Sequence, residues 1–179
     1  DYKTLADGFR WYDQVDDYDL VETNIESTVQ EFGYPIQVPS YMPKDYAVRD
    51  VKAKDHDVLE IVYTETGRDG EFGPKLTFSN TDIVYRMGWA IDTVVTPILE
   101  KTNYKAKDAV SFTTPNGISV NTLGSRKDAI QIAYWEKDNK VHMLYFASSI
   151  NENFVSKIVD SVCPMSKVAA DDTRLRGDR

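Results

Sequence analysis

Two apolar segments separated by a short polar connection constrain the fold of this 179-residue chain more than any other feature. Residues 129–135 read AIQIAYW and residues 141–147 read VHMLYFA, and both have the composition of β-strands. The connection between them, EKDNK, is polar and has the length of a hairpin loop. This region therefore predicts two antiparallel strands that are neighbours in a sheet.

Further strand-like segments precede this hairpin along the chain. In VLEIVYT (58–64) the side chains of Leu59, Ile61 and Tyr63 fall on one face, as the period of two requires. Prolines 39 and 43 fix their own φ angles, so the segment around them is expected to be a stiff bridge into the sheet. The other expected strands are 36–38, 47–51, 75–79, 109–113 and 118–123.

Two amphipathic helices are expected on either side of these strands. Asp19 begins a helix over about 20–32, and Ser149 begins a second helix that Pro164 ends. Each of the two capping residues is followed by a glutamate three positions later, which is the spacing of a capping box. Strands grouped between helices predict an α+β fold, with an antiparallel meandering sheet of about six or more strands and an N-terminal and a C-terminal helix packed on it.

The expected organisation is one folded domain between two extensions. Residues 1–18 mix acidic and aromatic side chains without a period and predict an irregular N-terminal lead-in. Residues 19–164 form the single α+β domain. Residues 165–179 carry charge without pattern and predict a loose C-terminal tail.

Residues 80–109 interrupt the strand pattern, and we expect a loop with short helical pieces there. Long nonregular stretches often carry binding surfaces, so the aromatic segment within it is the candidate binding surface, formed by Tyr85, Arg86 and Trp89. Such side chains can make a shallow pocket for an apolar ligand or a peptide. The alternative, which the pattern favours, is a loop held against the sheet by its own aromatic side chains.

Charge and cysteine content exclude several classes of partner and site. The formal net charge of −8 disfavours binding to nucleic acid and to anionic membrane surfaces. Cys163 is the only cysteine, which excludes an internal disulfide and a multi-cysteine metal site, and we expect it to be a small buried apolar side chain at the end of the last helix. The sequence contains no run of 18 apolar residues, the length that a helix needs to span a bilayer, and no signal-peptide pattern follows Asp1. We expect a mature fragment with a possible upstream lipid or helix anchor.

The residue types that carry catalysis or bind metals are sparse. His56 is expected in a solvated turn, and His142 is expected to be a packed or edge residue of a strand, so no base stands beside a nucleophile. The acidic clusters at 55–57 and 16–19 lack the spacing of a metal site. The glycines of 67–73 match neither phosphate-binding pattern. We therefore expect no catalytic, cofactor-binding or metal-binding residues.

The order of several motifs resembles a known family. A helix that ends in EFGYPIQVPSYMPKDYAV is followed by LEIVYT, KLTFSN, YRMGWAID, NGISVNTLG, IQIAYWEKDNKVHMLYF and the closing FVSKIVDSV. Over roughly residues 20–163 this order is similar to the domain of unknown function 4367. The resemblance implies an extracytoplasmic domain of a Gram-positive lipoprotein or of an anti-sigma-type regulator, and it brings no catalytic residues with it. The apolar segment 92–108 departs from the family pattern and leaves its local structure and role open.

The leading functional expectation is an extracytoplasmic, noncatalytic domain, secreted or anchored at the cell surface. It would bind an unknown protein or envelope component, or sense the envelope. The alternative is a carrier that holds a lipid or small apolar ligand on the curved face of the sheet. An enzyme ranks last, because neither a base–nucleophile pair nor a set of metal ligands is visible.

Overall fold

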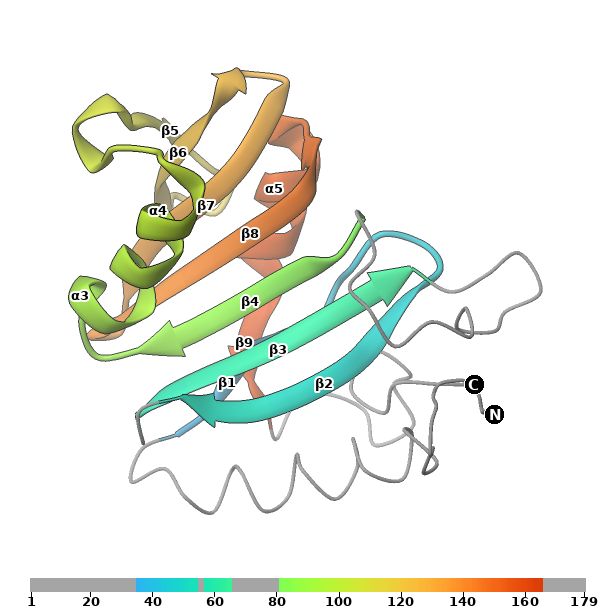
Figure 1. The fold of residues 1–179 in the computed structure, drawn as a ribbon. Coiled ribbons are helices and arrows are strands. Elements are labelled where there is room, and N and C mark those ends of the chain that lie inside the picture. Colours follow the sequence, from blue (N-terminus) through green and yellow to red (C-terminus); the bar gives the residue numbers. More distant parts are fainter. Residues whose placement is uncertain (1–34, 55–56, 66–80, 166–179) are drawn as a thin grey trace.

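A seven-stranded antiparallel sheet forms the centre of the computed structural model, which describes residues 35–54, 57–65 and 81–165 (Figure 1). The order of the strands across the sheet is β2-β3-β4-β8-β7-β6-β5. Their bounds are β2 Tyr46–Lys54, β3 Val58–Glu65, β4 Ile83–Gly88, β5 Val110–Thr113, β6 Ser119–Arg126, β7 Ala129–Lys137 and β8 Lys140–Ile150. The long hairpin expected at 129–147 is thus confirmed as β7 and β8.

The sheet consists of two meanders that meet in its middle. Strands β2, β3 and β4 are sequential neighbours, and the chain then crosses to the far edge and returns through β5, β6, β7 and β8. The crossing contains α3 (Ile91–Val94), α4 (Thr96–Thr102) and the 3-10 helix η1 (Ala106–Asp108). Strand β8 consequently lies beside β4, although their first residues are more than fifty positions apart. This pairing joins the end of β4 to the β7–β8 hairpin.

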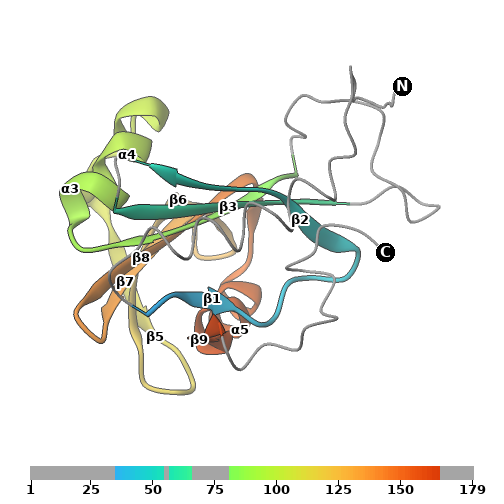
Figure 2. The same cartoon turned by 90° about the horizontal axis from the view of Figure 1, so that it is seen from below.

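The two faces of the sheet are covered by different elements. Helix α5 (Glu152–Ser161) and the small sheet of β1 (Gln37–Pro39) and β9 (Val162–Pro164) lie on one face, and α3 and α4 lie on the other (Figures 1 and 2). Val155, Ile158 and Val159 of α5 are buried in the larger apolar cluster. Val94, Val95 and Leu99 belong to a second cluster on the opposite face. The central strands read as nearly continuous apolar runs because both of their faces are buried.

Strand β4 contradicts the expected loop over 80–109. Ile83 and Met87 are four residues apart, which resembles a helix, but with Tyr85 they are alternate residues of a strand that face the larger cluster. Arg86 on the other face obscured the pattern, because a charged residue is rarely buried unless it is paired. The short helical pieces expected in this segment are present as α3, α4 and η1, and Pro97 lies in the first turn of α4.

The closing helix begins later and ends earlier than its sequence predicts. Ser149 belongs to β8, and the N-cap is Asn151, whose side chain accepts a hydrogen bond from the Phe154 amide at 2.9 Å. The helix ends at Ser161 because the next three residues leave it to pair with β1. Cys163 is therefore a half-buried residue of β9 opposite Val38, and not a buried residue at the end of a helix.

The α+β class and the antiparallel sheet are confirmed. The helix expected over 20–32, the strand expected over 75–79, and almost all of the two expected extensions lie outside the described residues. Among the residues that the structure describes, no helix is long and apolar enough to cross a membrane.

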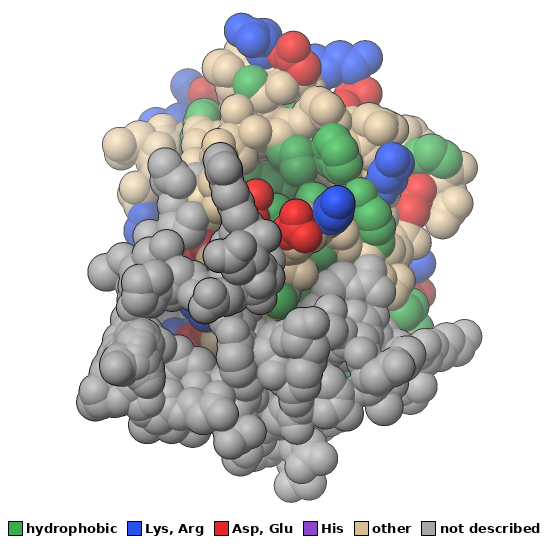
Figure 3. Space-filling view, turned by 90° about the vertical axis from the view of Figure 1, so that its right-hand side faces the viewer, with side chains coloured by type: hydrophobic (Ala, Val, Ile, Leu, Met, Phe, Trp, Pro, Cys, Tyr) green, Lys and Arg blue, Asp and Glu red, His purple; other side chains and the backbone are tan. Residues whose placement is uncertain are grey.

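One side of the molecule is shown in Figure 3. Lysine, arginine, aspartate and glutamate side chains are interspersed there over the described residues, with a group of apolar side chains among them. The described part of this side therefore presents no extended field of one sign.

Candidate functional site

The three residues of the candidate binding surface separate in the structure. Tyr85 and Arg86 both lie in β4 and are buried, and the alternation of the strand directs them to opposite faces of the sheet. Trp89 follows directly after the strand, and 49% of its surface is exposed. Two of the three side chains are buried and cannot contact a partner, so of these residues Trp89 alone remains available.

Arg86 fixes the position of α3 on the sheet. Its guanidinium donates from Nη1 to Glu60 Oε2 at 2.6 Å, from Nε to the Val94 carbonyl at 2.8 Å and from Nη2 to the Thr93 carbonyl at 2.9 Å. The last carbonyls of a short helix have no partner within the helix, and a cation there is favourable. The buried arginine thus provides hydrogen bonds to the last carbonyls of α3, and the Glu60 carboxylate balances its charge. Its role is structural.

A second buried cluster joins β4, β7 and β8. The Tyr85 hydroxyl donates to the Gln37 carbonyl at 3.0 Å and lies 2.9 Å from His142 Nδ1. Because a carbonyl only accepts and a hydroxyl carries one proton, Nδ1 is the ring nitrogen that donates to Tyr85. The imidazole also stacks on Trp135, with 5.2 Å between ring centroids and an angle of 6°. His142 is thus a packed residue of a central strand.

Burial determines the charge of His142. Removal from water lowers the pKa of its imidazole from the ordinary 6.5 to about 4, and the backbone of Lys137 opposes this only in part. The ring is therefore neutral at pH 7. A neutral, fully buried imidazole that contacts Tyr85 and Trp135 is not placed to act on a substrate.

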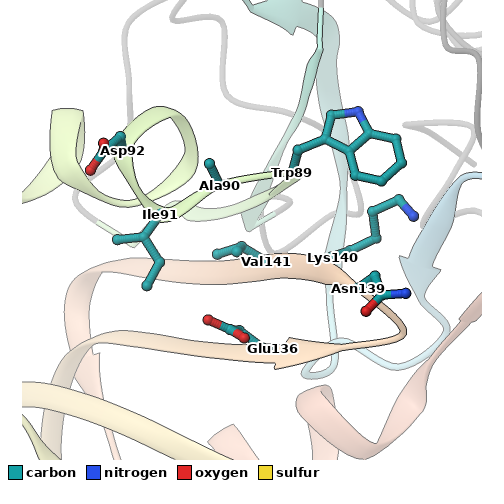
Figure 4. Close-up of a pocket in the computed structure, with 8 residues that line it drawn as sticks. All are labelled: Trp89, Ala90, Ile91, Asp92, Glu136, Asn139, Lys140 and Val141. Carbon is teal, nitrogen blue, oxygen red and sulfur yellow. The ribbon is translucent and has the colours of Figure 1, made fainter.

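A surface pocket lies where β4 meets α3 and the β7–β8 hairpin (Figure 4). Its volume is about 460 Å³. We call it the Trp89 pocket, and its lining residues are Trp89, Ala90, Ile91, Asp92, Glu136, Asn139, Lys140 and Val141. The Lys140 ammonium lies 4.0 Å from the centroid of the Trp89 ring, an arrangement in which the ring attracts the cation.

Close packing at Gly88 holds the end of β4 against α3 and against the residue before β3. A Cβ atom at this position would lie 2.8 Å from Val94 Cγ2 and 3.1 Å from the Asp57 carbonyl oxygen. Only glycine allows β4 to approach α3 and the start of β3 this closely. The turn that follows carries Trp89 and Ile91 to the surface, where 39% of Ile91 is exposed.

Sequence reasoning identified Trp89 and missed the side of the pocket formed by β7 and β8. Residues 136–140 had the pattern of an ordinary hairpin connection, and Ile91 belonged to the expected loop. The pairing of Gly88 with Val141 brings the two segments together. No local signal in the sequence could reveal this pairing, because the strands are distant in the chain.

A second pocket, of about 420 Å³, lies beside the edge strand β5. Its lining includes the apolar side chains of Val110, Phe112, Leu123 and Ile130 together with Arg126 and other polar residues. It is independent of the Trp89 pocket, with which it shares no lining residue.

Within the described ranges no group of three or more His, Cys, Asp or Glu residues could hold a metal ion. His56 and the acidic residues at 16–19 lie outside these ranges, as do Asp55 and the glycines of 67–73.

In comparisons with models of protein families, with curated proteins and with solved structures, nothing matches the chain. The resemblance to the domain of unknown function 4367 therefore stays an expectation from the sequence.

Proposed function

We propose that this chain is a noncatalytic binding domain that captures its partner at the Trp89 pocket. The observation that carries the proposal is that Trp89 and Ile91 are both exposed and both line one concave site. Large apolar side chains of the described residues are otherwise exposed at one further position, Val110. Exposed aromatic and apolar side chains that border a pocket are typical anchors of binding sites.

The chemistry of the pocket favours a partner with both apolar and polar groups. Trp89 offers an aromatic surface and Ile91 an aliphatic one, and Figure 4 shows the Glu136 carboxylate on the side of the pocket toward Ile91. Asn139 adds an amide, and Lys140 an ammonium group that partly balances the acidic residues. Such a mixture suits a segment of a protein or a component of the cell envelope, and it does not select strongly for an anion or a cation.

The carrier alternative is less favoured by the geometry. A carrier needs free space on a face of the sheet, but the side chains that face α5 are buried in one continuous cluster. The opposite face is occupied by the side chains of α3 and α4. A bound lipid would have to displace part of this packing, at a cost of about 2–5 kcal/mol for each large side chain.

The extracytoplasmic location, with anchoring by an upstream lipid or helix, rests on the sequence resemblance alone. The packing of a helix over 20–32 on the sheet is a separate expectation, which rests on the capping residue Asp19 and the amphipathic pattern of the sequence. Within this proposal the domain presents the Trp89 pocket to the envelope, either to hold a partner or to sense the presence of one.

The proposal is tested by following backbone and indole signals in NMR spectra during titration with solubilised cell-wall fragments and with detergent-solubilised membranes from Gram-positive bacteria. We expect shifts at Trp89, Ile91 and Lys140, and loss of binding in Trp89→Ala. Val110→Ala is the matched control, since it removes the other exposed apolar side chain and leaves the pocket intact. Equal binding by Trp89→Ala, with no shift at the pocket, would refute the proposal.

A further inference from the structure

The two edges of the main sheet differ in how they are protected. Strand β2 at one edge contains a β-bulge at Arg49 and an ion pair of 2.9 Å between Asp50 and Lys52. Bulges and charges on edge strands discourage pairing with another chain. Strand β5 at the other edge has the sequence VSFT and a regular ladder with β6, without charge, proline or bulge. Of the two described edge strands, β5 therefore has neither a charge nor a bulge, and its one protection is its length of four residues.

Backbone groups of β5 point away from the sheet at two positions. The Thr114 amide donates to the Ile118 carbonyl at 2.8 Å, and the Val110 carbonyl accepts from Thr122 Oγ1 at 3.0 Å, so residues 110, 112 and 114 face β6. Antiparallel strands alternate in this respect, so the amides and carbonyls of Ser111 and Thr113 face outward. Among described residues nothing pairs with this side of β5.

The preceding loop leaves the outer side of β5 open. Tyr104 donates its hydroxyl to Gln131 Oε1 of β7 at 2.6 Å, and both Tyr104 and Ala109 pack against the apolar cluster that also contains α4. The loop from α4 to β5 is thus held against a face of the sheet. Val110, Ser111 and Thr113 are all exposed, and 68% of the surface of Val110 is accessible to solvent.

We infer that β5 pairs with β5 of a second copy of this chain, and so forms a two-fold dimer in which the described main sheets of both copies are continuous. With the axis at Phe112, Ser111 of each copy lies opposite Thr113 of the other, and all outward amides and carbonyls of these residues gain partners. The two Phe112 side chains then face each other on the α5 side. A Ser–Thr pair and an aromatic pair are both favourable across strands.

The local charges permit this pairing although the net charge of −8 on each chain opposes it. The paired segment Val110–Thr113 contains no charged side chain, so no like charges lie directly opposite one another within the new ladder. Salt screens the repulsion between the two acidic molecules without weakening the backbone hydrogen bonds. Dimerisation is therefore expected to strengthen as the salt concentration rises, in contrast to an interface held by ion pairs.

The test is sedimentation equilibrium of the full chain up to millimolar concentration, with and without added salt. Thr113→Pro removes the outward amide, keeps the bonds to β6 and is tolerated at a sheet edge, and it should weaken dimerisation by at least about tenfold. Thr113→Val is the matched control, since it keeps the amide and the branched shape, and it should dimerise like the unchanged protein. The melting temperature of each variant verifies that it folds.

Hydrogen exchange gives a second measurement that needs no variant. The Ser111 and Thr113 amides should exchange quickly in dilute solution and become protected at high concentration, while the exchange of Phe112 changes little. A protein that stays monomeric at every concentration, with unchanged exchange at both amides, would overturn the inference. Dimerisation of Thr113→Pro at the strength of the control would also overturn it, because the copies would then meet on another surface. Neither result bears on the Trp89 pocket, so the proposed function is judged separately.

Discussion

The buried imidazole of His142 should make the stability of this protein depend on pH in a way that one substitution removes. In the folded state its pKa is about 4, and in the unfolded chain it returns to about 6.5. Between these values the unfolded chain binds a proton that the folded protein does not, so stability falls as the pH is lowered through this range. Each pH unit below the ordinary pKa of about 6.5 lowers the free energy of unfolding by about 1.36 kcal/mol. Between about pH 7.5 and about pH 5, His142 therefore lowers the free energy of unfolding by roughly 2 kcal/mol.

The variant that tests this is His142→Phe, which retains an aromatic ring against Trp135 and leaves the Tyr85 hydroxyl bonded to the Gln37 carbonyl. Urea unfolding of both proteins at the two pH values gives four free energies of unfolding. Contributions of the carboxylates and of His56 are common to both proteins and cancel in the difference. The unchanged protein should lose about 2 kcal/mol more than the variant between the two pH values. Equal losses would show that His142 is charged in the folded state or reaches water, and would refute the reasoning.

Three further substitutions test contacts within the sheet and at the Trp89 pocket. Arg86→Lys should lower the free energy of unfolding by about 2–4 kcal/mol and increase hydrogen exchange in α3, because an ammonium cannot reproduce the geometry of the guanidinium. Unchanged hydrogen exchange in α3 would contradict the structural role of Arg86. Gly124→Ala should cost about 2–4 kcal/mol in urea unfolding, because its Cβ would overlap the carbonyl oxygen of Ala129 and force β6 and β7 apart. Lys140→Met should change stability by less than about 1 kcal/mol while it alters the fluorescence of the exposed Trp89, and a larger loss of stability would show that the cation is more than a surface contact.

Local patterns were sufficient wherever a segment alternates cleanly. The segment 129–147 could be assigned to a hairpin because its apolar runs and polar connection are contiguous, and β3 could be assigned because one face of 58–64 is uniformly apolar. The closing helix was found from its apolar stripe, and only its limits were wrong. The residues after Ser161 pair with β1, which lies more than a hundred positions earlier in the chain. No capping rule contains that information.

Strand β4 shows why the candidate site could be predicted only in part. Its apolar face is compatible with a helix as well as a strand, and Arg86 suggested an exposed segment. The arginine is buried because Glu60 of β3 and two carbonyls of α3 converge on it. That convergence depends on the sheet having formed. Trp89 was recognised as unusual from its neighbours, but its partners in the pocket come from β7 and β8.

The sequence by itself determined the α+β class, most of the strands, the acidic charge and the unusual position of Trp89, because each depends on composition or on residues close together in the chain. Tertiary structure alone decided that β4 lies beside β8, that Tyr85 and Arg86 are buried, and that β2 and β5 are the two edge strands of the main sheet. The physical reason is that antiparallel pairing between distant strands is set by the packing of both sheet faces together. The Trp89 pocket and the edge of β5 both arise from that packing.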